Sequence, residues 1–270
     1  MQVASFAYYY ANGGEGVAIE SIFIYRPDRK REIWRFFLYM LLHAGYGRIE
    51  VTLRLGSPLR KFIKFPIGLF DSWLHVAFNV VVQILVGLPL EMVHGSLRIA
   101  AIYMAGVLAG SLGTSVMDPG VYLVGASGGV YALLAAHLAN VLLNYHHMHC
   151  GVVRLLGVFA IASADVGFAV YNRYAGGGDG VGGAPPVSFV AHLAGALAGL
   201  TIGLIVLKNF GQNLHEKLIW WVGLGVYMAC TLFAILYNVF SDTSSRAVFL
   251  DDIPKDNFVF VEPVPLGSLS

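Results

Sequence analysis

Hydrophobic residues fall into six long runs, which are separated by short polar or charged stretches. A run of about 17–25 apolar residues is long enough for a helix to cross the hydrocarbon core of a bilayer. Arg98, Arg154, Lys208 and Lys217 flank these runs. We therefore predict six transmembrane helices: Trp73–Glu91, Leu97–Val116, Ser127–Tyr145, Val152–Tyr171, Ser188–Leu207 and Leu218–Phe240.

The remaining segments have other patterns. Phe36–Ala44 is apolar but too short to cross, and it follows a charged run that ends in Trp34-Arg35. That pattern favours an interfacial helix with an aromatic anchor. We interpret residues 1–21 as the stub of a further span, Met1–Tyr10, followed by a luminal segment. Residues 241–270 are polar and rich in proline and acids, which predicts a disordered tail.

Composition supports an integral membrane protein. The chain is 57% hydrophobic and 12% charged, whereas soluble domains carry roughly a quarter charged residues. The lipid bilayer is therefore its expected surroundings. A formal net charge of +1 gives no reason to expect a nucleic-acid partner, and two cysteines give no disulfide framework.

The polar residues inside the runs gather at one depth. Consecutive spans run in opposite directions, so the first, third and fifth begin on the same side of the membrane. The first carries His75 and Asn79 on one helix face, the third begins at Ser127, and the fifth carries His192. Polar residues within a span are costly in lipid and usually face the bundle interior. We expect these four side chains to lie close together.

This set of side chains suits nucleophilic catalysis. A histidine can act as the general base that removes the hydroxyl proton of a serine nucleophile, and His75, Asn79 and backbone N–H groups near Ser127 could donate to an oxyanion. Tyr131 lies one turn below Ser127 and could pack against the His192 imidazole. Each residue alone has a common structural explanation, such as a hydrogen bond to its own backbone or between helices. Their coincidence at one depth favours catalysis.

A stripe of small residues predicts which helices touch. Gly195, Gly199 and Gly203 follow His192 on one face of the fifth span. Such a stripe lets two helix backbones approach closely. The third span offers a matching face of Gly128, Ala132, Ala135 and Ala139.

Two further groups of polar residues have weaker patterns. Asp165 lies in the fourth span toward the same surface, but nothing in the sequence places it beside His192, so we favour a structural role over that of a third triad member. His146, His147 and His149 have metal-ligand spacing. They fall in a short loop at the opposite surface, and we interpret them as exposed loop residues rather than as a metal site.

These motifs together resemble the rhomboid intramembrane serine proteases, in particular the animal secretase-type members with six core helices and a seventh. The resemblance runs from about Ile22 to Phe240, so residues 22–240 would form the membrane domain. The matching motifs are Trp34-Arg35, His75-x-x-x-Asn79, Gly87-x-x-x-Glu91-x-x-x-Gly95-x-x-Arg98, Gly125-Ala126-Ser127-Gly128 with Tyr131, and Ala191-His192-x-x-Gly195-x-x-x-Gly199.

The resemblance implies an all-α polytopic transmembrane bundle with a Ser127–His192 dyad and neither a catalytic aspartate nor a cofactor or metal. It implies an oxyanion site from His75, Asn79 and the Ser127 backbone N–H, supported by Gly125, Gly128 and Tyr131. The implied reaction cuts a peptide bond in or near the transmembrane helix of single-span substrates, typically precursors of epidermal growth factor-like ligands in the secretory pathway. The alternatives are an inactive rhomboid-like protein that binds transmembrane clients and, more remotely, a transporter, for which internal repeat symmetry is not apparent.

The chain departs from the family pattern at two places. The family's first transmembrane helix is largely missing, with Met1–Tyr10 as its stub. Residues 46–72 separate His43-Ala44-Gly45 from Trp73-Leu74-His75, and removing them would restore the family's continuous entry into the first predicted span. Our hypothesis is a retained intron translated in frame. The alternative is a real loop insertion with five basic residues, namely Arg48, Arg54, Arg60, Lys61 and Lys64.

Overall fold

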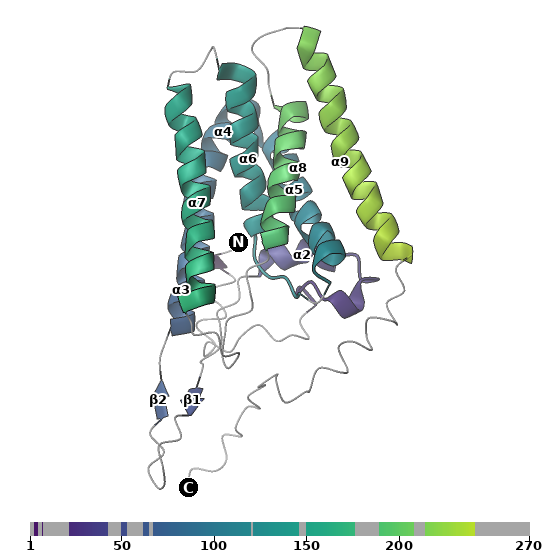
Figure 1. The fold of residues 1–270 in the computed structure, drawn as a ribbon. Helices are drawn as coiled ribbons and strands as arrows, with labels where there is room; N and C mark the ends of the chain where they lie inside the picture. Colours follow the sequence, from purple (N-terminus) through teal and green to yellow (C-terminus); the bar gives the residue numbers. More distant parts are fainter. Residues whose placement is uncertain are drawn as a thin grey trace.

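The computed structural model describes residues 3–4, 7, 22–42, 50–52, 62–64, 67–119, 121–145, 150–175, 189–207 and 214–240. Its body is a bundle of long helices, seen side-on in Figure 1. The long helices are α3 (Ile67–Val82), α5 (Ser96–Met117), α6 (Ser127–Asn144), α7 (Gly151–Ala175), α8 (Phe189–Val206) and α9 (Leu214–Phe240). Shorter helical elements are η1 (Pro27–Arg29), α2 (Arg35–Leu38), η2 (Tyr39–Leu41) and α4 (Leu88–His94). The predicted all-α bundle is confirmed.

Each predicted span folds as helix. The first predicted span, Trp73–Glu91, lies within α3, α4 and the π-helical turn η3 (Gln83–Gly87) that joins them without a break. Within the described residues, four stretches are long and apolar enough to cross a membrane: His75–His94, Ser96–Met117, Phe189–Val206 and Trp220–Phe240. The third and fourth predicted spans fold as α6 and α7.

Several predictions fall wholly or mainly outside the described residues. These are the stub and luminal segment in 1–21, the tail 241–270, and His146, His147 and His149. Within the stretch 46–72, the structure describes two strands and the start of α3. The strands β1 (Glu50–Thr52) and β2 (Phe62–Lys64) pair in antiparallel fashion, with Val51 opposite Ile63. Whether this stretch is an intron product or a true insertion stays a prediction.

Three helices, α5, α6 and α8, form the packed centre of the bundle, and α6 and α8 share the most extensive contact. Glycine makes this packing possible, because a side chain would meet neighbouring backbone or a neighbouring Cβ. A methyl group on Gly106 of α5 would collide with Ala132 of α6, and one on Gly113 would come 2.7 Å from the Cβ of Ala194 in α8. Small residues at helix contacts are the usual way for membrane helices to associate.

The segment before and within α2 closes one end of the bundle. Arg35 is buried, and its guanidinium donates to the Glu32 carboxylate at 2.6 Å and to the Ile24 carbonyl at 2.8 Å. Tyr25 exchanges backbone hydrogen bonds with Leu123 in the loop before α6. Trp34 remains half exposed, in agreement with the predicted interfacial anchor.

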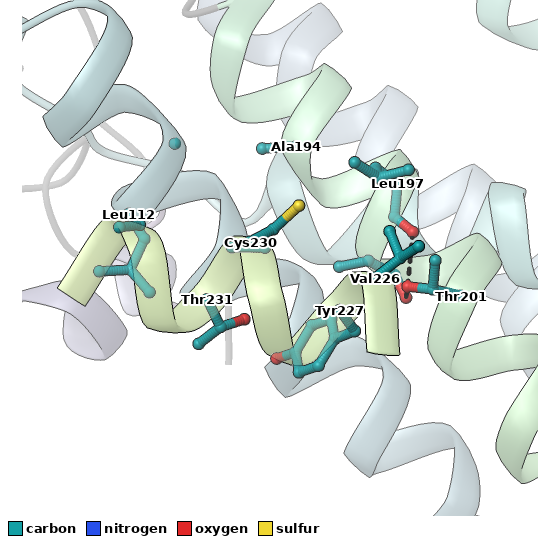
Figure 2. A pocket seen from close by; sticks show the side chains of 12 residues that line it. Leu112, Ala194, Leu197, Thr201, Val226, Tyr227, Cys230 and Thr231 are labelled. Atoms are coloured by element: carbon teal, nitrogen blue, oxygen red, sulfur yellow. Dashed lines mark hydrogen bonds between the residues drawn. The ribbon is translucent and has the colours of Figure 1, made fainter. Parts of the chain in front are cut away.

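Helix α9 lies against α5 and α8 and leaves a small cavity of about 90 Å³ between them. Figure 2 shows its lining, with Leu112 from α5, Leu197 and Thr201 from α8, and Val226 and Cys230 from α9. The Thr201 hydroxyl is satisfied by the Leu197 carbonyl at 2.8 Å, so the cavity presents a mainly apolar wall.

Candidate active site

The starts of α3, α6 and α8 point to the same end of the bundle, the end at which α2 also lies (Figure 1). This is the arrangement that helix parity predicts for the first, third and fifth spans. The end is covered by the segment that contains Tyr25 and Tyr39, which contacts the loop leading into α6. The candidate site therefore lies near the N-terminal ends of three helices rather than on a loop.

Ser127 is the first residue of α6, and only 9% of its surface is exposed. Gly125, two residues earlier, has φ = +107°, a conformation that glycine adopts without strain, and its N–H donates to the Tyr39 carbonyl at 3.1 Å. Ala126 gives no side-chain cap. Since the first N–H groups of a helix have no acceptor within it, the Ser127 N–H points out of the helix start and can serve an oxyanion.

The predicted glycine stripe holds α8 directly against α6. A methyl group on Gly195 would collide with the Gly128 carbonyl, and one on Gly199 would collide with the backbone of Ala132. Further along, a Cβ on Gly203 would lie 3.1 Å from the Cα of Ala136. The close approach of these two helices brings the start of α6 next to the part of α8 that carries His192.

His192 is buried, with 4% of its surface exposed, and it contacts the predicted Tyr131. The two rings stack with centroids 4.2 Å apart and an interplanar angle of 16°. The Nε2 atom of His192 is buried and makes no hydrogen bond in the structure. Burying a nitrogen without a hydrogen-bond partner costs folding free energy, so such an atom in a folded protein usually has a function. A neutral imidazole nitrogen of this kind can accept a proton.

Asp165 of α7 joins this group of side chains, a neighbourhood that the sequence did not predict. One carboxylate oxygen, Oδ2, accepts a hydrogen bond from the Tyr131 hydroxyl at 2.6 Å, and the same oxygen lies 3.8 Å from Nδ1 of His192. The second distance is that of an ion pair rather than of a hydrogen bond. Sequence reasoning noted the depth of Asp165 but had no means of placing α7 beside α6 and α8.

His75 and Asn79 occupy the first helix, as predicted. His75 is close enough to both His192 and Asp165 to interact electrostatically with each. Asn79 is fully buried one turn further along α3, and its backbone carbonyl accepts a hydrogen bond from the Gln83 amide at 3.1 Å. The predicted oxyanion donors thus come from α3, while the serine and histidine come from α6 and α8.

The cavity beside α9 is not part of this site. Residues 194, 197, 198 and 201 line it from α8, whereas His192 and the glycine stripe occupy the other side of that helix, as the helical period of 3.6 residues requires. In the part of the chain that the structure describes, no three His, Cys, Asp or Glu side chains come together as metal ligands. The chemistry available at the site is that of a hydroxyl, an imidazole, a carboxylate beside the imidazole, and fixed hydrogen-bond donors.

Comparison with known proteins agrees with this geometry. Residues 62–209 match the rhomboid domain model. The chain is 41% identical over 224 residues to mouse "Rhomboid-related protein 2", covering 82% of this chain and 64% of the relative. It is 38% identical over 227 residues to human "Rhomboid-related protein 3", covering 83% and 49%. It is also 29% identical over 233 residues to "Inactive rhomboid-related protein 2" of Caenorhabditis elegans, covering 83% and 57%.

The fold and the buried polar cluster define an integral membrane protein whose central helices contact one another through small residues. The chain belongs to the rhomboid family, because the family model matches more than half of its length. It spans about half to two-thirds of the length of these curated relatives.

Proposed function

We propose that this chain is an intramembrane serine protease that cuts single-span membrane proteins within or beside their transmembrane helix. The observation that carries the proposal is the α6–α8 contact, which has no room for side chains at Gly195 and Gly199 and so brings the part of α8 that carries His192 to the start of α6. His192 has a buried Nε2 without a hydrogen bond, ready to take the Ser127 proton. Catalytic hydrogen bonds often tighten only when substrate binds.

The reaction would begin when Ser127 Oγ attacks the scissile carbonyl carbon and its proton moves to His192 Nε2. The new Oγ–C bond pushes an electron pair onto the carbonyl oxygen, where the Ser127 N–H, His75 and Asn79 would stabilise the negative charge. His192 would then give its proton to the leaving amine, and water would release the acyl group from Ser127.

The substrate class follows from the surroundings. A transmembrane helix hides its carbonyls in internal hydrogen bonds, so the cut segment must unwind before attack, and glycine or serine near the bond should favour cleavage. The site lies toward one end of the bundle, the end from which the water that the reaction consumes would have to enter. We propose epidermal growth factor-like precursors as substrates and the secretory pathway as the location, with the site facing the lumen or the outside.

The test is a cleavage assay on the full chain in detergent and in liposomes, with a single-span substrate whose product is mapped by mass spectrometry. We expect Ser127→Ala and His192→Ala to reduce product to the uncatalysed background. Ser96→Ala is the matched control, which should leave cleavage unchanged: Ser96 also begins a helix, α5, but its hydroxyl donates to the Glu91 carboxylate at 2.6 Å. Equal product from the chain and from Ser127→Ala would contradict the proposal.

A second candidate function is client binding without cleavage, and the similarity to a relative named inactive favours testing it. In that case the chain would retain a single-span protein in a pull-down from detergent, and the amount retained would be the same for Ser127→Ala. No new terminus would appear in the retained protein under any condition.

A further inference from the structure

Asp165 is an acidic residue inside a predicted span, and the proposed reaction assigns it no step. Its side chain is 11% exposed. Ionisable residues at membrane depth are rare and usually mark a functional site or a paired charge. The question is therefore which groups Asp165 pairs with, and whether that pairing supports the fold alone or the chemistry of His192.

Asp165 interacts with His75 of α3, and it reaches the His192 imidazole by two further routes. The direct route is the 3.8 Å approach of Oδ2 to His192 Nδ1. The indirect route passes through Tyr131, whose hydroxyl donates to the same oxygen at 2.6 Å and whose ring stacks on His192 at 4.2 Å. A single carboxylate oxygen is thus linked to the edge and to the face of one histidine ring.

This arrangement selects one form of the histidine. A carboxylate beside Nδ1 favours the tautomer that carries its hydrogen there, because that N–H points at the negative charge. Nε2 then keeps its lone pair, and in the structure Nε2 is the buried atom without a hydrogen bond. After Nε2 takes the serine proton, the ring becomes positive, and a carboxylate at this distance stabilises that charge most strongly at the step where it forms.

We propose that Asp165 is a positioning residue for His192, holding the imidazole in the Nδ1–H tautomer and stabilising the imidazolium during attack by Ser127. The proposal rests on the proposed protease function. In the step, the Ser127 O–H bond breaks, the proton goes to Nε2, and Asp165 stays a carboxylate throughout. Among the residues that the structure describes, the other titratable groups beside His192 are Tyr131 from α6 and His75 from α3, and His75 also interacts with Asp165.

Substitutions can separate the charge of Asp165 from its hydrogen bond. Asp165→Asn keeps an oxygen that can accept from Tyr131 but removes the negative charge. Tyr131→Phe keeps the stacked ring but removes the hydroxyl. Asp28→Asn is the matched control, because it makes the same chemical change at a carboxylate paired with Arg26 at 2.6 Å, outside the candidate site.

Two rates should be measured for each variant: kcat and KM on a single-span substrate, and labelling of Ser127 by a fluorophosphonate. Labelling forms an Oγ–P bond, releases fluoride and transfers the serine proton to His192, so it reports activation without substrate binding. We expect Asp165→Asn to lower kcat and labelling together by about 10- to 100-fold, which is less than the roughly 10²–10⁴-fold contribution of the general base itself. We expect an unchanged KM, a smaller loss for Tyr131→Phe and none for Asp28→Asn.

A second measurement needs no substitution of Asp165. Nitrogen-15 spectra of the histidines in the unsubstituted chain, with His192 assigned by comparison with His192→Asn, report which ring nitrogen carries hydrogen. The proposal predicts hydrogen on Nδ1, and a neutral ring with hydrogen on Nε2 would overturn it even if Asp165→Asn did not fold. Wild-type rates in Asp165→Asn, with Ser127→Ala silent, would overturn this inference alone. A chain that neither cleaves nor is labelled would overturn the protease function as well.

Discussion

Helices α8 and α9 are both long and apolar enough to cross a membrane, yet they relate to the bundle in opposite ways. In its most apolar window, 39% of α8 is buried inside the protein, against 11% of α9. The glycines of α8 meet the backbone of α6, whereas Gly225 of α9 has no atom within 4 Å of the position of an added Cβ. Apolar character places both helices in lipid, and small residues at fixed spacing decide which one enters the core.

The contrast extends to the contacts between helices. Between α6 and α8 there is no space for a methyl group, while between α8 and α9 a cavity of about 90 Å³ remains, as Figure 2 shows. The side of α8 that lines this cavity lies opposite His192. Any movement between α6 and α8 would change the distance between the predicted nucleophile and its base, so rigidity is concentrated where the proposed chemistry needs it.

The largest expected effect comes from adding one methyl group to the tight interface. Gly199→Ala forces a Cβ into the Ala132 backbone, which cannot yield as a side chain would. Overpacking usually costs roughly 1–3 kcal/mol, and we expect this variant to lie at or above the upper end. Thermal unfolding in detergent should show a clear drop in Tm, together with loss of cleavage.

The matched substitution in α9 is Gly225→Ala. With open space around Gly225, and alanine the better helix former, we expect an unchanged or slightly raised Tm. If Gly199→Ala and Gly225→Ala gave the same Tm, the contrast between the two helices would be wrong.

Two alanine-to-valine substitutions test the same contrast, with a smaller expected loss of stability. Ala132→Val places two methyl groups where Gly106 and Gly199 approach, and we expect a loss of about 1–3 kcal/mol in unfolding free energy. Ala109→Val adds the same groups to a residue that lines the cavity beside α9. It should be neutral or stabilise the protein, because filling an apolar void restores packing contacts. The difference in Tm between the two variants is the measurement, and equal losses would show that the cavity is not space the protein can fill.

The smallest expected change in stability comes from the hydrogen bonds of Asn238, which lies near the C-terminal end of α9. The Asn238 amide donates to Ser115 Oγ at 2.6 Å and to the Ala234 carbonyl at 2.8 Å. Asn238→Leu removes both bonds, and the loss of the one that joins α9 to α5 should cost about 1 kcal/mol. Because α9 does not hold His192, we expect a modest drop in Tm and unchanged kcat. A loss of cleavage would indicate that α9 contributes to the site, and would contradict the proposal that only α8 of these two helices holds it.

Much of this fold follows from the sequence because lipid restricts the choices. Apolar run length located six helices, four of which, among the described residues, are long and apolar enough to cross a membrane. Alternation of direction placed Ser127 and His192 at one end of the bundle. The glycine stripe at 195, 199 and 203 predicted which two helices are in contact, and in the structure these glycines of α8 lie against α6. Each of these inferences depends on order along one helix or on small-residue spacing, which a sequence displays directly.

Other features depend on which helices become neighbours around the bundle axis. Asp165 was recognised at the right depth, but only the placement of α7 against α6 brings its carboxylate to Tyr131. The π-helical turn Gln83–Gly87 was also missed, since its apolar sequence has no mark that separates it from α-helix. The cavity beside α9 arises from a mismatch of several side-chain shapes, which no single motif encodes.

The division of the site between distant segments has a consequence for biosynthesis. Chains are made from the N-terminus, and domains generally fold in that order. Tyr39 must wait for the Val107 carbonyl, 68 residues later, which its hydroxyl bonds at 2.8 Å. Ser127 must wait longer, until the ribosome has delivered α8 and its glycines have found α6. The nascent chain would therefore carry its serine through translation without a base beside it, and would become competent only when the bundle is nearly complete.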